Sequence, residues 1–401
     1  LTQRISTITL RRAINEAKKH GYDDLHNNLQ ELSALLQRLA TGLYRDQEKL
    51  VTKEQFVTEI TKIRKPDELA EALEDAADDI RSLEKTSSMG TIATFLKGWT
   101  EGDAGFSRIL SVKDIRTERT ILLSHRCLDP SLPAKAVIDN AHCTIIMSGT
   151  LTPTTMFADI LGFPKHTIQK SLPSPFPASN KCCLIVPNVT TKFTQRSELQ
   201  FQNIASTCAN IVNNIKGCSA VYFPSYAVRD SVANYLTTAC TKTVFTEDPK
   251  ASKAEREGLL QRCTQYKELG AVLLGVAAGS FGEGIDLPGI LKCVIVVGIP
   301  LDRPDLETKE LINYYDKKFH KGWDYGYVLP AITKTLQNAG RCIRSETDRG
   351  VLVFMDERYA QPMYSKCFPA DWDPKIALNP VPLITEFFTA KPILQVQAKP
   401  L

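Results

Sequence analysis

Two arginines near residue 340 are the residues of this chain whose type and spacing could do chemistry. They lie in QNAGRCIR (337–344), where Arg341 and Arg344 stand one turn apart if the stretch is helical. Guanidinium groups are planar and permanently charged, so they suit the negative charge that spreads over a transferring phosphoryl group. Surface arginines that pair with Glu346 and Asp348 explain the same residues equally well. The stretch alone leaves a phosphate clamp and a surface ion-pair cluster both open.

A second stretch, GSFGEGID (279–286), ends an apolar run about fifty residues upstream. Its glycines let the backbone approach a ligand closely, while Glu283 and Asp286 could orient water, a metal ion or a partner arginine. In the first stretch, Gln337 could hold a phosphate-bound water or a ribose edge, and Gly340 would let the helix pack against the next element. Together the two stretches predict one side of a nucleotide site.

Two further stretches follow predicted strands, at the ends where loops of α/β sheets carry ligands. In SGTLTP (148–153) a simple Ser-Gly turn is as good an explanation as a binding loop. In VYFPSYAVRD (221–230), Ser225 is a candidate N-cap whose helix terminus could hold a nucleic-acid phosphate, and Tyr226 could stack on a base. A cap with a packed aromatic is the alternative interpretation.

The elements around these stretches must hold them in place. From about residue 181 onward, predicted strands and helices alternate along the chain. This pattern predicts an α/β fold with a parallel sheet covered by helices on both faces. The proline-rich LPSPFP (172–177) is a natural boundary before it. The predicted strands are CCLIV, SAVYF, KTVF, AVLLGV, CVIVVGI and GVLVFM, and the predicted helices are 197–215, 225–238, 251–267, 304–319 and 327–344.

The first hundred residues have a different, helical pattern. Apolar residues recur at three-to-four spacing in 25–43 and 66–84, and Pro66 suits the first turn of its helix. From 107 to 165 the sequence predicts strands in FSRILSV and RTILLSH, a short helix, and a strand in CTIIMSGTL (143–151). The helical region therefore predicts a separate domain, inserted into or preceding the α/β part.

Composition sets outer limits on the function. The chain has 401 residues, 49 basic and 45 acidic, so its net charge of +4 supports nucleic-acid binding only weakly. The eleven cysteines include no CxxC, which argues against disulfides and a zinc ribbon and favours free thiols in a reducing compartment. No apolar run reaches the roughly 20 residues of a membrane span. We expect a soluble protein without a membrane partner.

Six motifs occur in an order that resembles a known family. SGTL, SPFP, KFTQR (192–196), FPSY, EGID and QNAGRCIRSETDRG resemble the motor motifs of the XPD family of superfamily 2 DNA helicases. The resemblance covers about residues 120–390, and the helical region resembles the family's arch domain by position and texture alone. It implies a helical arch-like domain in 1–115, the C-terminal part of motor domain one in 116–170, and a RecA-like motor domain two in 171–401.

The resemblance also implies roles for individual residues. Arg341 and Arg344 would act on the nucleotide phosphates as catalytic residues. Further residues would bind ATP or couple its cleft to the strand: Gln337, Gly340, Glu283, Gly284, Asp286, Ser148, Gly149 and Thr150. A third group would contact DNA: Ser225, Tyr226, Lys192, Arg196 and Ser280.

Three features of the family are missing from this sequence. No GxxxxGK[ST] loop occurs, and no DEAH box; VIDNAH (137–142) imitates the latter, but Asn140 replaces its Glu, and we interpret it as an ordinary helix. The scattered cysteines do not match the family's 4Fe-4S cluster. We therefore expect ATP and Mg²⁺ to be shared with a motor domain one that lies upstream, and this chain to be inactive alone.

The resulting hypothesis is an ATP-dependent DNA helicase of DNA repair that moves 5′ to 3′ on single-stranded DNA. By the same likeness, other repair proteins would be partners, and the location would be cytoplasmic and nucleoid-associated in a prokaryote or nuclear in a eukaryote. A DinG-like helicase is one alternative. A non-catalytic module that binds DNA or a repair partner is another.

Overall fold

The structure, a computed structural model, describes residues 2–100, 102–115, 118–284, 287, 289–301 and 304–390. These residues form two compact units, and the chain passes between them several times. The first unit comprises Leu1–Ile145, Ala158–Thr167 and Pro304–Gly322, and the second comprises Ile146–Phe157, Ile168–Arg303 and Trp323–Leu401. Among the described helices, none has the length and apolar character needed to cross a membrane. The division expected from the motifs, into arch and two motor domains, stays a prediction.

The first unit contains an antiparallel sheet in the order β1-β4-β3-β2. Its centre is the predicted hairpin of β3 (Phe106–Ile115) and β4 (Glu118–Cys127). β1 (Gln3–Ser6) pairs with β4, and β2 (Glu48–Leu50) pairs with β3. The sequence did not predict β1 or β2, because so few residues cannot show a two-residue alternation and become strands only through pairing with the hairpin.

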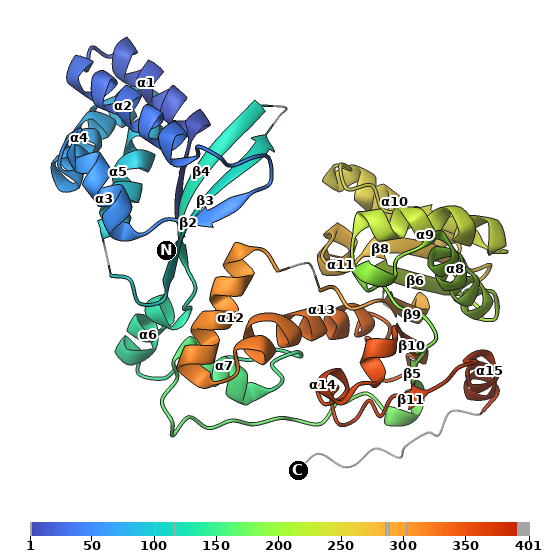
Figure 1. Ribbon diagram of the computed structural model, residues 1–401. Helices are drawn as coiled ribbons and strands as arrows, with labels where there is room; N and C mark the ends of the chain where they lie inside the picture. Colours follow the sequence, from blue (N-terminus) through green and yellow to red (C-terminus); the bar gives the residue numbers. More distant parts are fainter. Residues whose placement is uncertain are drawn as a thin grey trace. The chain divides into compact units, whose positions relative to one another are not determined.

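Helices pack beside this sheet in Figure 1 and bury one apolar face each. The predicted helical stretches 25–43 and 66–84 correspond to α2 and α4, and Pro66 stands in the first turn of α4 as expected. Leu29 and Leu36 of α2 and Leu73 of α4 are fully buried. The helices before the hairpin are α1 (Thr7–Lys19), α2 (Asp23–Leu39), α3 (Lys53–Thr61), α4 (Pro66–Glu84) and α5 (Ser88–Thr100).

Helix α12 (Leu306–Phe319) belongs to the first unit, although the sequence predicted that it would cover the parallel sheet. Its polar anchors explain the difference. Asp129 accepts hydrogen bonds from the Tyr314 hydroxyl at 2.5 Å and from the Lys318 ammonium at 2.7 Å. An ion pair also joins Arg126 to Glu307. Charge partners more than a hundred residues away decide where this helix lies, and a local pattern does not contain them.

The second unit contains a parallel sheet in the order β11-β5-β10-β9-β6-β8-β7, which confirms the α/β prediction. Strands β6, β8 and β10 are buried throughout, and this burial on both faces explains their unbroken apolar sequences. Only β11 was not predicted. The strands are β5 (Lys181–Ile185), β6 (Cys218–Phe223), β7 (Thr243–Thr246), β8 (Ala271–Val276), β9 (Leu291–Val297), β10 (Gly350–Met355) and β11 (Lys375–Ile376).

Helices and aromatic side chains cover the two faces of this sheet. One face packs against α8, α9 and α15 around Val221, Ile295 and Val353. The alternate residue Phe354 instead contacts the rings of Tyr359 and Phe368. The helices of this unit are α8 (Glu198–Asn213), α9 (Tyr226–Ala239), α10 (Lys253–Gln265), α11 (Ser280–Gly284), α13 (Leu329–Ala339), α14 (Pro362–Ser365) and α15 (Val381–Thr389), with short turns η1 (Ala178–Asn180), η2 (Phe193–Gln195), η3 (Asp324–Val328) and η4 (Glu357–Ala360).

The link between β4 and β5 contains two further helices, α6 (Ser131–Asn140) and α7 (Thr154–Leu161). The expected helix at VIDNAH is the end of α6. The strand predicted for 143–151 is absent, and these residues have neither strand nor helix structure. Ile145 and Met147 are 77% and 85% exposed. The apolar run remains extended chain because no described strand lies beside it to take its backbone hydrogen bonds.

Candidate nucleotide and nucleic-acid site

The carboxyl ends of the parallel strands bring the predicted motifs to one edge of the sheet. FPSY follows β6 and the GSFGEG stretch follows β8, and these two strands are direct neighbours. Parallel strands all end at the same edge, where open α/β sheets bind ligands. The site is therefore built from loops that the sheet holds close together.

Helix α13 and the turn that follows it are each tied to the loop after β8 by a hydrogen bond. The buried Asn338 donates from Nδ2 to the Ala277 carbonyl oxygen at 3.1 Å, and Arg341 donates from Nη2 to the Gly282 carbonyl oxygen at 2.6 Å. A Cβ at Gly282 would lie 2.3 Å from the Ala277 oxygen, so only glycine fits this turn. The structure thus places residues 279–284 beside the 337–344 stretch, as the sequence predicted.

The two arginines lie on a turn and not on a helix, which corrects the expected geometry. Helix α13 ends at Ala339, five residues before the predicted end at 344. The buried Asp348 explains why the chain turns there, since its Oδ2 accepts from the backbone N–H of Arg344 and of Ser345, both at 2.9 Å. Arg341 and Arg344 therefore extend from a turn whose backbone a carboxylate holds.

Gly340 does not do what the sequence predicted. A Cβ added there would meet only the carbonyl oxygens of Leu336 and Gln337, at 3.2 and 3.8 Å. Its φ of −61° is ordinary helical backbone. Within the described part of the chain, no neighbouring element approaches closely enough to require a glycine at this position.

The SGT motif reaches the same edge through Gln337. Gln337 is exposed and donates from Nε2 to the Thr150 hydroxyl at 3.2 Å. Ser148 holds the turn, because its hydroxyl accepts from the Thr150 backbone N–H at 3.2 Å. Gly149 is exposed, with no atom within 4 Å of where its Cβ would be. The motif therefore lies beside QNAGRCIR although it does not end a buried strand.

The contacts of Ser225 and Tyr226 bear on the two interpretations that the sequence left open. Ser225 is an N-cap, and its hydroxyl accepts from the Val228 N–H at 3.4 Å. The half-buried Tyr226 donates its hydroxyl to Glu247 at 3.2 Å, and the Arg229 guanidinium lies 4.8 Å from its ring centroid. Burial, and then the Glu247 carboxylate, raise the pKa of Tyr226. The packed-aromatic interpretation is the one that these contacts support.

Glu247 is the residue that the sequence reasoning missed. It is only 1% exposed, and its carboxylate also accepts from the Ser280 hydroxyl at 2.7 Å and from the Val276 and Phe281 backbone N–H groups at 3.0 and 3.2 Å. It therefore joins the FPSY loop to the GSFGEG loop. The signal was present, because Glu247 directly follows β7 and so lies at the same edge of the sheet.

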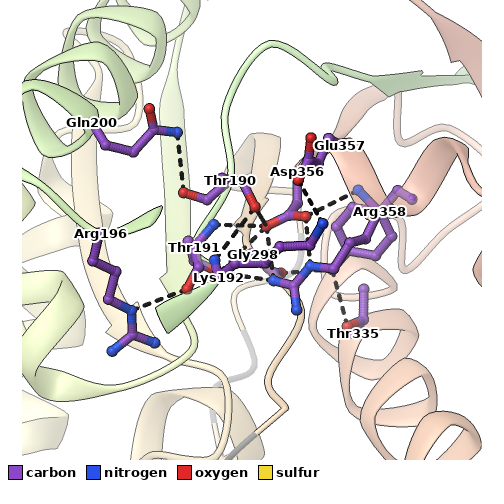
Figure 2. Close-up of polar contacts among 11 residues, drawn as sticks. Thr190, Thr191, Lys192, Arg196, Gln200, Gly298, Thr335, Asp356, Glu357 and Arg358 are labelled. Carbon is purple, nitrogen blue, oxygen red and sulfur yellow. Dashed lines mark hydrogen bonds and ion pairs between the residues drawn. The ribbon is translucent and has the colours of Figure 1, made fainter. Parts of the chain in front are cut away.

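Lys192 and Arg196 belong to the loop after β5, which Figure 2 shows beside the ends of β9 and β10. Lys192 forms an ion pair with Glu357 at 2.8 Å. Arg196 is exposed and donates from Nε to the Thr191 carbonyl oxygen at 3.0 Å. The buried Asp356 holds Thr191 in turn, accepting from its backbone N–H at 2.9 Å. This loop is a second cationic segment at the carboxyl edge.

Three predicted site residues cannot be placed. Asp286 lies outside the described residues, and for Glu283 and Gly284 only the backbone of α11 is described. The described side chains include no group of three or more His, Cys, Asp or Glu residues suited to a metal ion. All eleven cysteines are free thiols. The described edge therefore offers cations and N–H donors to a phosphate.

The sequence and the fold of this chain are similar to those of known helicases. Residues 208–375 match the helicase C-terminal domain family. The chain is 26% identical over 254 residues to the XPD helicase subunit of general transcription and DNA repair factor IIH from Dictyostelium discoideum, covering 58% of this chain and 32% of that protein. It is 24% identical over 384 residues to the ATP-dependent DNA helicase XPD of Sulfolobus acidocaldarius, covering 90% of this chain and 62% of that protein.

The solved structure of S. tokodaii Xpd4 has the same fold, with a TM-score of 0.61 at 16% identity over 94% of this chain and 72% of that one. The matched segment contains strands β6 to β10 of the parallel sheet, so this part of the second unit matches a helicase C-terminal domain. In sequence and in fold the chain is similar to helicases of the XPD family. It spans between 32% and 39% of the length of its eukaryotic relatives from Dictyostelium, budding yeast and fission yeast.

Proposed function

We propose that this chain is the ATP-responsive half of an ATP-dependent DNA helicase of DNA repair. One observation carries the proposal: Arg341 is hydrogen-bonded to the loop after β8, beside Gln337 and Thr150, in a segment that matches the helicase C-terminal domain. Cations, an amide and a hydroxyl therefore converge where an α/β sheet binds ligands.

In this proposal Arg341 and Arg344 donate to the phosphates of ATP held by another domain. Mg²⁺ held with the ATP by that other domain would neutralise part of the phosphate charge. The turn that Asp348 holds sets the direction of the two guanidinium groups, and Gln337 stands next to them with an amide that can donate or accept. The expected roles of Glu283, Gly284 and Asp286 complete this side of the cleft.

The same loops offer a physical connection between the cleft and a bound strand. Arg341 contacts Gly282, whose neighbour Phe281 donates its N–H to Glu247, and Glu247 also accepts from Tyr226. A movement of Arg341 with the phosphates would thus displace the loops that hold Ser225, Tyr226 and Ser280. Hydrogen-bonded loops at the ends of rigid strands are suited to transmit such a movement.

The remaining parts of the proposal rest on the family. One relative is named as an ATP-dependent DNA helicase, and another is named as the helicase subunit of a general transcription and DNA repair factor. We propose that the first unit includes the arch, that translocation is 5′ to 3′ on single-stranded DNA, and that a motor domain one must supply the other phosphate-binding residues. This chain alone would then bind DNA without hydrolysing ATP.

The test compares DNA-stimulated ATP hydrolysis by this chain with that of the same chain joined to a motor domain one. Activity is expected only in the joined protein. ATP hydrolysis by this chain alone would contradict the proposal that a motor domain one must supply the other phosphate-binding residues. Binding without hydrolysis by both proteins would favour the non-catalytic alternative.

A further inference from the structure

Phe193 is an exposed aromatic side chain between two cations. It is 83% exposed, and it begins the short turn η2 between Lys192 and Arg196. The Arg196 guanidinium carbon lies 5.5 Å from the centre of its ring. A single exposed apolar side chain is ordinary on a protein surface, but this ring lies beside a guanidinium on a cationic loop, which is the setting of aromatic side chains that stack on bases.

The loop that carries Phe193 is held from beneath by Asp356. This carboxylate is fully buried, and its Oδ2 accepts from the Thr191 backbone N–H at 2.9 Å and from the Thr191 hydroxyl at 3.3 Å (Figure 2). The Thr190 hydroxyl lies 3.4 Å from the same oxygen. The backbone just before Phe193 is therefore fixed at consecutive residues.

Arg358 completes the support by neutralising the buried carboxylate. It donates from Nε to Asp356 Oδ1 at 2.8 Å and from Nη2 to Oδ2 at 2.9 Å, and Nη2 also lies 3.1 Å from the Thr191 hydroxyl. Gly298 closes the other side, because a Cβ there would lie 2.2 Å from Thr191 Oγ1. Gln200 donates to the Thr190 carbonyl oxygen at 3.1 Å. Little room remains for the loop to move.

We propose that Phe193 is a stacking platform for a base of single-stranded DNA, with Lys192 and Arg196 on the flanking backbone phosphates. The assignment rests on the proposed function and adds a binding residue to it. Aromatic side chains beside cations are how proteins hold single strands without reading sequence. A loop that is already fixed loses little conformational entropy when a base stacks on it.

The test measures binding of a fluorescent oligo-dT that contains 2-aminopurine to the 401-residue chain at several salt concentrations. Phe193→Ala should weaken binding roughly 5- to 150-fold, with an unchanged slope against salt, because stacking releases no counterions. Phe193→Trp should retain binding and quench the 2-aminopurine. Arg196→Gln should instead reduce the slope by about 0.7, the value for one phosphate contact on a single strand.

Leu199→Ala is the matched control, because Leu199 is also an exposed apolar residue. Its side chain is 67% exposed and lies in the first turn of α8. Its affinity should not change. If Phe193→Ala binds the oligonucleotide within about twofold of the unsubstituted chain, Phe193 does not stack on the strand. The inference is then wrong, and the proposed function is not affected. If the unsubstituted chain does not bind single-stranded DNA, the proposed function fails with it.

Discussion

Gln337 and Thr150 are 187 residues apart in sequence and are joined by a hydrogen bond of 3.2 Å from the Gln337 amide to the Thr150 hydroxyl. The contact ties the SGT turn, which lies in extended chain, to the helix that precedes the two arginines. A movement of this segment would therefore reach the turn that holds Arg341 and Arg344, the residues proposed to bind phosphate. A single exposed hydrogen bond contributes modestly, at the low end of about 0.5–1.5 kcal/mol.

Thr150→Val should loosen the segment around Ser148 without unfolding the sheet. Hydrogen exchange of the amides of 148–152 should accelerate about twofold, in line with a loss of about 0.5 kcal/mol. Gln337→Ala should have the same effect, and the double variant no more than either. Thr238→Val, on an exposed position of α9, is the control. Additive effects of the two substitutions would show that the bond does not hold the segment.

Arg341→Ala should abolish DNA-stimulated ATP turnover in the protein that includes a motor domain one. An arginine on the transferring phosphoryl group contributes on the order of 10³ to 10⁵ in rate. Binding of single-stranded DNA, measured by fluorescence anisotropy, should stay largely intact. Arg262→Ala removes an exposed arginine from α10 of the same unit and should leave both properties unchanged. If Arg341→Ala hydrolyses ATP at the normal rate, Arg341 does not act on the transferring phosphoryl group.

Strands β6, β8 and β10 of the second unit were predictable because each is buried on both faces and reads as one apolar run, as in AVLLGV and GVLVFM. The same reasoning failed at CTIIMSGTL, which is equally apolar but has no described strand beside it. Apolar character reports what a segment can bury. It does not report whether a neighbour is present to bury it against.

The candidate site was predictable where its residues cluster in sequence and not where they meet only in the fold. QNAGRCIR and GSFGEGID were found as motifs, and Arg341 does contact Gly282. Glu247 and Asp356 were not singled out, although each follows a strand and holds a site loop. Their position directly after a strand was a signal, but their partners come from other elements, so the sequence around them does not show which loops they hold.

Glu247→Gln should destabilise the second unit and detach the loop after β8. Glutamine has the shape of glutamate, but its NH₂ group would face N–H and O–H donors that now have a carboxylate to bind. Leaving such a buried donor unsatisfied costs about 1–3 kcal/mol, to be measured by urea unfolding. Glu257→Gln, on the exposed face of α10, is the matched control and should change stability by less than about 0.5 kcal/mol. Equal stability of the two variants would contradict the role given to Glu247.

Two glycines allow a matched comparison at the loop after β5. Gly298 has a φ of +69°, and a Cβ there would lie 2.2 Å from Thr191 Oγ1. Gly298→Ala should therefore cost at least about 2 kcal/mol and weaken DNA binding, because it displaces the support of Phe193. Gly258→Ala adds a methyl group to α10 where nothing lies within 4 Å, and it should stabilise by about 0.5–1 kcal/mol. Thermal unfolding and oligonucleotide binding distinguish the two. If Gly298→Ala folds and its DNA binding is unchanged, the contacts that support the loop are not needed for DNA binding.

His125 should make the first unit sensitive to acid. The side chain is 1% exposed, neither ring nitrogen has a hydrogen-bond partner in the described structure, and the ring stacks on Phe106 at 4.4 Å between centroids. Burial, and then the charge of Arg108, lower the pKa of His125 to about 4 from its ordinary value of 6.5. Between pH 6.5 and pH 4 this proton binds to the unfolded state and not to the folded state. The contribution of His125 to the free energy of unfolding is therefore fully present above pH 6.5 and is lost as the pH falls to about 4.

The loss of stability assigned to His125 is up to about 3 kcal/mol, since one pKa unit corresponds to about 1.4 kcal/mol. His125→Phe keeps a ring of similar size against Phe106 and removes the titration, so its unfolding free energy should fall less between pH 7 and pH 4.5 than that of the unsubstituted chain. Carboxylates that titrate in this range are the same in both proteins and cancel in the difference. Urea unfolding at the two pH values measures it. Parallel pH profiles for the two proteins would mean that His125 finds a partner or water when it is protonated, and that its burial does not make the unit acid-sensitive.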